Sequence, residues 1–197
     1  PYLVHVDEWT QLASSNEIIK QGTLTVLSNP VYGGDPGWNQ VGEVGSNLFW
    51  AVFHQISGID WLAIYRYFPS IVFVITVLSV YVLARRQGFG WEAALFTCLI
   101  PTTVGILGPS FLIPMSLALL FIPVSLFLAF NFTSIPAYVA LFLLFTGVAS
   151  IHPPTAASLA IVFVPYIILN LKGNFRHSLA LTVALGAPAL VLFPLIY

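Results

Sequence analysis

Apolar and polar positions divide this chain of 197 residues into two unequal parts. Up to position 60, apolar residues are mixed with charged and turn-forming ones, whereas apolar runs then follow one another almost without a break. A helix needs about 20 apolar residues to cross a bilayer, so the pattern predicts an all-α polytopic membrane protein with about six transmembrane helices. Residues 61–197 would form one integral membrane domain. The expected spans are 61–84, 91–107, 110–130, 135–151, 154–171 and 177–197.

Residues 1–60 are expected to form an external loop that carries two short helices. The first, at 8–21, has apolar residues at roughly helical spacing and a stop signal at Gly22. The second, at 46–56, is apolar on one side and is expected to lie in the headgroup zone, parallel to the membrane. Between them, 23–45 is rich in Gly and Pro, which favour bends, and is predicted to be an ordered loop.

The composition agrees with lipid as the solvent for most of the chain. Only 7% of the residues are charged, whereas roughly a quarter are charged in soluble domains. Basic residues indicate the orientation, because cytoplasmic loops are enriched in Lys and Arg. With the polar segment outside, alternating spans place His152 outside and most basic residues inside. The basic residues expected inside are Arg85, Arg86, Lys172 and Arg176.

Carboxylates are concentrated in the polar segment, which restricts where acid–base chemistry can occur; beyond position 60 only Glu92 remains. The most conspicuous element is the adjacent pair Asp7 and Glu8. On a helix, consecutive side chains diverge by about 100°, so this pair cannot clamp one metal ion. One carboxylate could serve as a general base at a membrane-level cavity while the other caps the helix or pairs with a cation. Alternatively, both are simply favourable charges at a helix N-terminus.

Signatures of metal and nucleotide sites are missing from the sequence. It contains no HExxH, no CxxC, no glycine-rich phosphate loop and no basic patch interleaved with aromatic residues. We therefore assign no metal ligands and expect no nucleic-acid partner. The absence of a phosphate loop favours a lipid-borne substrate over a soluble nucleotide.

The order of features in the first 86 positions resembles a known family. The features are His5-Val-Asp7-Glu8-Trp9, then Ile18-Ile19-Lys20-Gln-Gly22, a Pro/Gly-rich loop, an interfacial helix, Gly58-Ile-Asp60 and Tyr65-Arg66-Tyr67-Phe68-Pro69. This order is similar to the first external loop of GT-C class membrane glycosyltransferases, particularly the protein O-mannosyltransferase and aminoarabinose transferase branch. The chain departs from that family in lacking the preceding span and the distal region. Because it begins without Met and ends inside an apolar run, we expect a fragment of a longer protein.

The resemblance implies an enzyme that moves a sugar from a polyprenyl-phosphate donor to an acceptor protein, lipid or glycan. The reaction would take place at the external face of an archaeal or bacterial plasma membrane. Asp7 matches the first residue of the family's acidic pair, which implies that it is the general base of an inverting displacement. Glu8 would orient groups or join a charge network. A divalent cation is compatible with this sequence but is not required by it.

The departing lipid phosphate needs a positive partner nearby. Arg66 and His152 are the candidate substrate-binding residues at the outer face. Arg66 lies near the start of the first expected span, where ordinary snorkelling to the headgroups is the alternative. His152 precedes two prolines at the outer end of a span, where a broken helix can expose a ring nitrogen, and a purely structural role is the alternative.

Two other functions compete with the glycosyltransferase. One is a transporter or flippase subunit, which would normally place an ionisable group near the middle of the membrane. The expected spans hold essentially none there. The other is a scaffold that keeps the fold without catalysis, because a fold alone does not establish chemistry.

Overall fold

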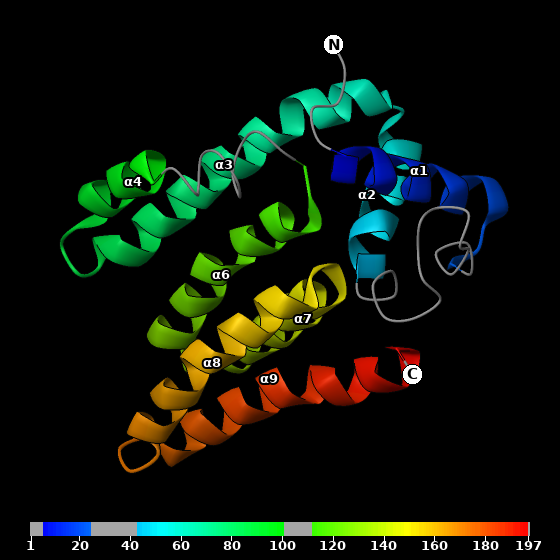
Figure 1. The fold of residues 1–197 in the computed structure, drawn as a ribbon. Helices are drawn as coiled ribbons and strands as arrows, with labels where there is room; N and C mark the ends of the chain where they lie inside the picture. The colour runs from blue at the N-terminus through cyan, green and yellow to red at the C-terminus, as the bar shows by residue number, and fades with distance from the viewer. Residues whose placement is uncertain (1–5, 25–42, 101–111, 197) are drawn as a thin grey trace.

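The computed structural model describes residues 6–24, 43–100 and 112–196 (Figure 1). This part of the chain is all-helical and has no strands, as expected. Its helices are α1 (Val6–Gln21), α2 (Val44–Ser57), α3 (Trp61–Arg85), α4 (Gly90–Leu99), α6 (Pro114–Asn131), α7 (Ile135–Ile151), α8 (Pro153–Asn170) and α9 (Phe175–Ile196).

Three helices are long and apolar enough to cross a membrane: α3, α6 and α8. Helix α7 is apolar but shorter, at 17 residues. The structure is therefore consistent with a helical membrane protein. The expected six spans are not confirmed. One expected span is wrong in its extent: the helix that begins near position 91 ends at Leu99, and Ile100 is extended with ψ 115°. Pro101 explains this end, because the residue before a proline is driven out of helical geometry.

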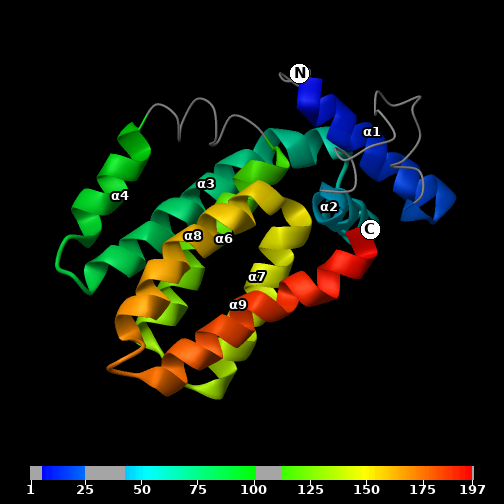
Figure 2. The ribbon, with the colours of Figure 1, turned by 60° about the horizontal axis from the view of Figure 1, so that its bottom comes forward.

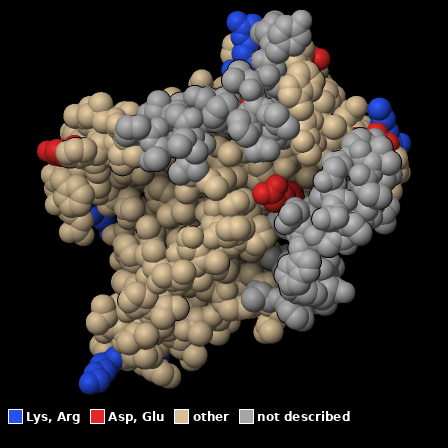
Figure 3. Space-filling model, in the orientation of Figure 1, with Lys and Arg blue, Asp and Glu red and all other residues tan. Residues whose placement is uncertain are grey.

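The helices from α3 onwards run back and forth between two ends of the molecule (Figures 1 and 2). Helices α7, α8 and α9 contact one another, and α3 packs against both α4 and α6. Short turns at Pro-rich or Gly-containing positions reverse the chain. We call the end that carries α1 and α2 the head end, and the end where α8 passes into α9 the basic end. In Figure 3 the surface between the two ends is almost uncharged, as a face in contact with lipid should be.

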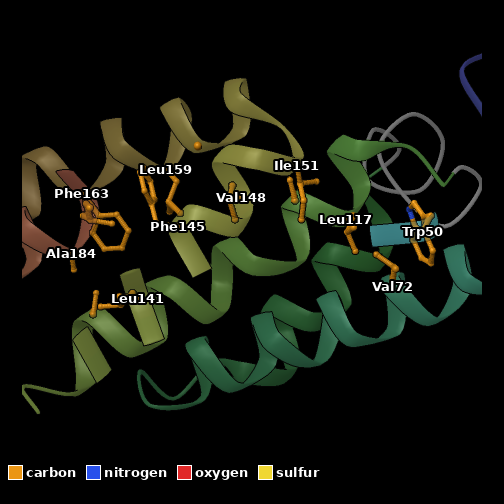
Figure 4. Packing of buried hydrophobic residues seen from close by; sticks show 14 of the residues in the cluster. Trp50, Val72, Leu117, Leu141, Phe145, Val148, Ile151, Leu159, Phe163 and Ala184 are labelled. Carbon is orange, nitrogen blue, oxygen red and sulfur yellow. The ribbon is translucent and has the colours of Figure 1, made fainter. Parts of the chain in front are cut away.

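One continuous core runs along the bundle from α2 to α9 (Figure 4). It is built mainly from aliphatic and Phe side chains that project inward from α6, α7, α8 and α9. Many large apolar side chains instead face outward, among them Leu169 and Ile161, which are 81% and 71% exposed. Outward apolar surface of this extent suits a hydrocarbon environment rather than water.

The polar segment forms the two helices expected of it, and both end at glycines, the first at the predicted Gly22. Gly22 and Gly58 each have φ 66°, a left-handed geometry that glycine adopts without strain. Asp60 then caps α3 by accepting a hydrogen bond from the Leu62 N–H at 2.9 Å. The ordered loop expected at 23–45 lies largely outside the described residues.

Helix α2 is fixed to the bundle by aromatic contacts and by one close backbone approach. The rings of Trp50 and Phe68 meet edge to face with centroids 5.4 Å apart, which joins α2 to α3. On the other side, Gly45 lies against α7 so closely that an added Cβ would stand 2.7 Å from the Ser150 carbonyl oxygen and carbon. A glycine is therefore required at the point where the head meets the bundle.

We predict that Gly45→Ala destabilises the protein by about 1–3 kcal/mol, because the new methyl group must displace the backbone of α7. The matched control is Gly147→Ala, where an added Cβ meets nothing within 4 Å. That change should leave stability unchanged or raise it by up to about 1 kcal/mol through helix propensity. Thermal unfolding in detergent measures both variants. Equal melting temperatures for the two would contradict the close contact between α2 and α7.

Candidate functional site

A group of buried or partly buried polar side chains lies at the head end, where α1 and α2 meet the bundle. We call it the polar head cluster. Its members come from α1, α2, α3 and the junction of α7 with α8. They are Glu8, Gln11, Ser15, Glu43, Asn47, Tyr65, His152 and Thr155.

Helix α1 contributes three of these side chains from one face. Glu8, Gln11 and Ser15 follow one another at helical spacing, so they point in a common direction. Gln11 donates to the Glu43 carboxylate at 3.0 Å. Ser15, which is fully buried, donates to the Asn47 side-chain oxygen at 3.4 Å. The inward face of α1 is thus partly polar.

Glu8 is the most deeply buried carboxylate of the described residues, with 2% of its surface exposed. Its Oε1 accepts a hydrogen bond from the backbone N–H of Leu112 at 2.9 Å. Leu112 is itself 1% exposed and lies two residues before α6, so its N–H needs a partner inside the protein. A charged acceptor makes this a strong hydrogen bond. Glu8 therefore holds the start of α6 against α1, and its expected role in orienting groups of the site stays a prediction.

Asp7 lies in the first turn of α1, directly before Glu8. Its side chain is outside the described part of the structure. The predicted role of Asp7 as a general base therefore stays a prediction. The structure does place the backbone of Asp7. It lies at the end of α1 that the next residue, Glu8, fixes to Leu112.

His152 forms the corner between α7 and α8. Its Nδ1 accepts from the Thr155 N–H at 3.3 Å, which caps α8, and lies 2.7 Å from the Thr155 hydroxyl. With Nδ1 acting as acceptor, the proton of the neutral ring belongs on Nε2. That Nε2 is directed at the Glu43 carboxylate, 3.9 Å away. His152 thus has both the structural role considered for it and one ring nitrogen directed at the cluster.

Arg66, the second candidate for the lipid phosphate, lies outside the polar head cluster. Its side chain is exposed, and its guanidinium lies 5.4 Å from the ring centroid of Tyr67 on the same helix. Within the described residues, no contact joins Arg66 to the polar head cluster. The structure places Glu8 and His152 in the polar head cluster, whereas Arg66, although it follows Tyr65 at the same end, has an exposed side chain outside the cluster.

Several buried polar atoms around the cluster have no hydrogen-bond partner in the described part of the chain. Two of them belong to the cluster itself: the Tyr65 hydroxyl and the Gln11 side-chain oxygen. A third, the Ser46 hydroxyl, lies beside it on α2. Buried polar groups without a partner are rare in folded proteins, and each needs an explanation, such as a water molecule, an ion or a catalytic role.

An apolar groove of about 490 Å³ opens beside the cluster. Its wall is formed by one side of α2, including Phe49 and Val52, and by Ser150 of α7. The volume lies within the usual range for ligand pockets, about 300–1,000 Å³. Ser150 is two residues from His152, and Gly45 in the same wall is two residues from Glu43. The groove therefore adjoins the polar cluster.

Sequence reasoning did not single out Glu43, Gln11 or Tyr65 as site residues. The spacing of Glu8, Gln11 and Ser15 along one helix face was a usable signal for a polar inward face. The expected amphipathic pattern instead relied on apolar residues such as Trp9, which is 46% exposed. No comparable signal marked Glu43, whose partners lie 32 and 109 positions away in the chain.

No group of three or more His, Cys, Asp or Glu side chains that could hold a metal ion is found within the described ranges. The divalent cation that the sequence left open stays an untested hypothesis. No protein-family model, curated protein or solved structure matches this chain.

We predict that acid weakens the corner formed by His152. Burial lowers the pKa of His152 below its ordinary value of 6.5. The unfolded chain then binds more protons than the native protein between pH 6.5 and the lower native pKa, so the free energy of unfolding falls as the pH falls through this window. His152→Asn keeps an oxygen acceptor for the Thr155 N–H but does not titrate. The wild type should lose more thermal stability than this variant between pH 7.5 and 5.5.

The neighbouring Glu43 provides the opposing influence, since its carboxylate favours a protonated ring. If the wild type gained stability relative to His152→Asn on acidification, the ion pair would outweigh burial. That result would contradict the prediction.

Proposed function

We propose that this protein is part of a glycosyltransferase that takes its sugar from a polyprenyl-phosphate donor, with the reaction at the head end. The observation that carries the proposal is the adjacency of an apolar groove to a buried polar cluster at the end of a membrane helix bundle. A lipid-linked sugar has the same two parts: an isoprenoid chain that belongs in an apolar groove, and a phosphate and sugar that need polar partners. The resemblance of the first 86 positions to GT-C enzymes supports the same function.

In the proposed reaction, the hydroxyl oxygen of the acceptor attacks the anomeric carbon of the sugar, and the Asp7 carboxylate accepts the proton of that hydroxyl. The bond from that carbon to the phosphate oxygen breaks, and polyprenyl phosphate departs with the bonding electrons. Attack from the opposite side inverts the configuration. A general base of this kind contributes about 10²–10⁴-fold to the rate.

The other residues of the proposed site assist without forming bonds to the sugar. Glu8 acts as a positioning residue, because its carboxylate is already bound to the Leu112 N–H. His152 offers its Nε2–H as a hydrogen-bond donor to the departing phosphate. Arg66 is assigned a weaker role, attraction of the anionic headgroup toward the outer surface, because it is exposed and outside the cluster.

Transport is the less well supported function. A transporter normally holds ionisable groups near the middle of its spans. Helices α6, α7 and α8 contain no Asp, Glu, Lys or Arg, and the two arginines of α3 lie toward its ends. Within the described residues, the charged side chains of these helices lie toward their ends, which favours chemistry at a membrane surface.

The test of this function is Asp7→Asn in the full-length protein, assayed with a panel of polyprenyl-phosphate sugars. We expect sugar transfer to fall by at least about 100-fold, because an amide cannot accept the proton. The matched control is Glu17→Gln, which also neutralises a carboxylate on α1. Glu17 contacts Lys20 and Gln21 on its own helix, so its loss should leave transfer within about twofold of the wild type.

Both variants are first compared with the wild type in melting temperature, so that a folding defect is not mistaken for lost chemistry. Unchanged turnover in a folded Asp7→Asn protein would reject Asp7 as the base. Failure of the wild type to transfer any lipid-linked sugar in the panel would reject the proposed function.

A further inference from the structure

A second apolar groove lies at the opposite end of the molecule, between α7 and α9. Its volume is about 470 Å³, which is also within the range of ligand pockets. Val139 and Phe142 of α7 line one side, and Leu179 and Val183 of α9 line the other. The outward side chains in this wall are open to the surroundings: Val139 is 51% and Val183 is 58% exposed. The groove therefore faces the lipid side of the bundle.

One charged residue contributes to the wall of this groove. Arg176 lies in the first turn of α9, and its side chain is exposed. This position is at the basic end, which also carries Lys172 and Arg85, and basic side chains stand there in Figure 3. The groove thus has a long apolar wall and a single cation at one end.

The wall of the groove beside Arg176 is held in place by buried hydrogen bonds. Tyr138, which lines the groove, has its hydroxyl 2.7 Å from Nδ1 of His177. His177 is 5% exposed, and its other ring nitrogen lies 3.4 Å from the Tyr166 hydroxyl of α8. A network that joins three helices leaves little freedom for Tyr138 to move into the groove. The groove is therefore preformed, which lowers the entropic cost of filling it.

The dimensions of the groove match one lipid chain. Its lining runs from Ile135 to Phe142 on α7 and from Arg176 to Ala184 on α9. At 1.5 Å per residue these stretches are roughly 10–12 Å long. One leaflet of the hydrocarbon core is about 15 Å deep, half of the whole. An acyl chain lying along the helices would therefore run from the interface into the leaflet, with its headgroup at the level of Arg176.

We propose that the groove between α7 and α9 is a binding site for an anionic glycerophospholipid, whose phosphate pairs with Arg176 and whose acyl chain lies between Val139 and Val183. The charge of the groove selects this occupant, because a cation at the interface favours an anionic headgroup over a zwitterionic one. The proposal is independent of the glycosyltransferase function, since the groove lies at the opposite end of the bundle from the polar head cluster.

The test is a lipid titration of the full-length protein in detergent, followed by native mass spectrometry, with phosphatidylglycerol and phosphatidylcholine as probes. The wild type should bind phosphatidylglycerol more tightly. Arg176→Gln should weaken phosphatidylglycerol binding about fivefold, as expected for one interfacial charge, and leave phosphatidylcholine unaffected. The matched control is Arg85→Gln, which removes a charge at the same end but outside the groove. It should change the binding of neither lipid.

A second pair of variants tests the apolar part without changing charge. Val139→Phe should fill the groove and weaken binding of both lipids, whereas Leu143→Phe, on an exposed position of the same helix outside the lining, should not. If Arg176→Gln and Arg85→Gln weakened phosphatidylglycerol binding equally, the preference for the anionic lipid would come from general surface charge. That result would overturn the proposal. Unchanged lipid binding in Val139→Phe would also overturn the proposal. If the wild type bound no lipid at all, the proposal would be overturned in favour of a protein segment as the occupant of the groove.

Discussion

The arrangement of the head end depends on one buried hydrogen bond, from the backbone N–H of Leu112 to the carboxylate of Glu8. A carboxylate removed from water is costly unless it is paired, and an unpaired backbone N–H beside it would add to that cost. Their hydrogen bond therefore lowers the cost of burying both groups, which are 104 positions apart in the chain. Because Glu8, Gln11 and Ser15 share one helix face, fixing Glu8 also directs Gln11 to Glu43 and Ser15 to Asn47. The contact with Leu112 thus sets the rotation of α1 and the place of its first turn on the bundle.

Among the described residues, charged side chains are concentrated toward the two ends of the molecule, and the two ends carry different sets of them. The head end combines carboxylates, a histidine and an apolar groove with buried hydroxyls that have no hydrogen-bond partner among the described residues. The basic end pairs another apolar groove with Arg176. Between them, helices α6, α7 and α8 carry no charged residue. This distribution supports the two proposals, a reaction at the head end and lipid binding at the basic end.

Local signals in the sequence predicted much of the fold. Gly22 and Gly58 end their helices because left-handed geometry favours glycine, and long apolar runs identified α3, α6 and α8. The expected span 91–107 ran past Pro101, whereas the helix ends at Leu99, because the residue before a proline is driven out of helical geometry. The site was harder to predict, because its contacts are non-local: nothing in the order of residues pairs Glu8 with Leu112 or Glu43 with His152. For Arg66 the sequence indicated a position at a span end, but the direction of its side chain around the helix depends on packing that the sequence alone did not fix, and its role at the phosphate stays a prediction.

The most direct test of this account is the rate at which the Leu112 amide hydrogen exchanges with deuterated solvent, compared between the wild type and Glu8→Ala. The account predicts slow exchange in the wild type and much faster exchange in the variant, with the amides in the middle of α6 unchanged in both. Equally fast exchange at Leu112 in the two proteins would contradict the hydrogen bond on which the position of α1, and with it the proposed site, depends.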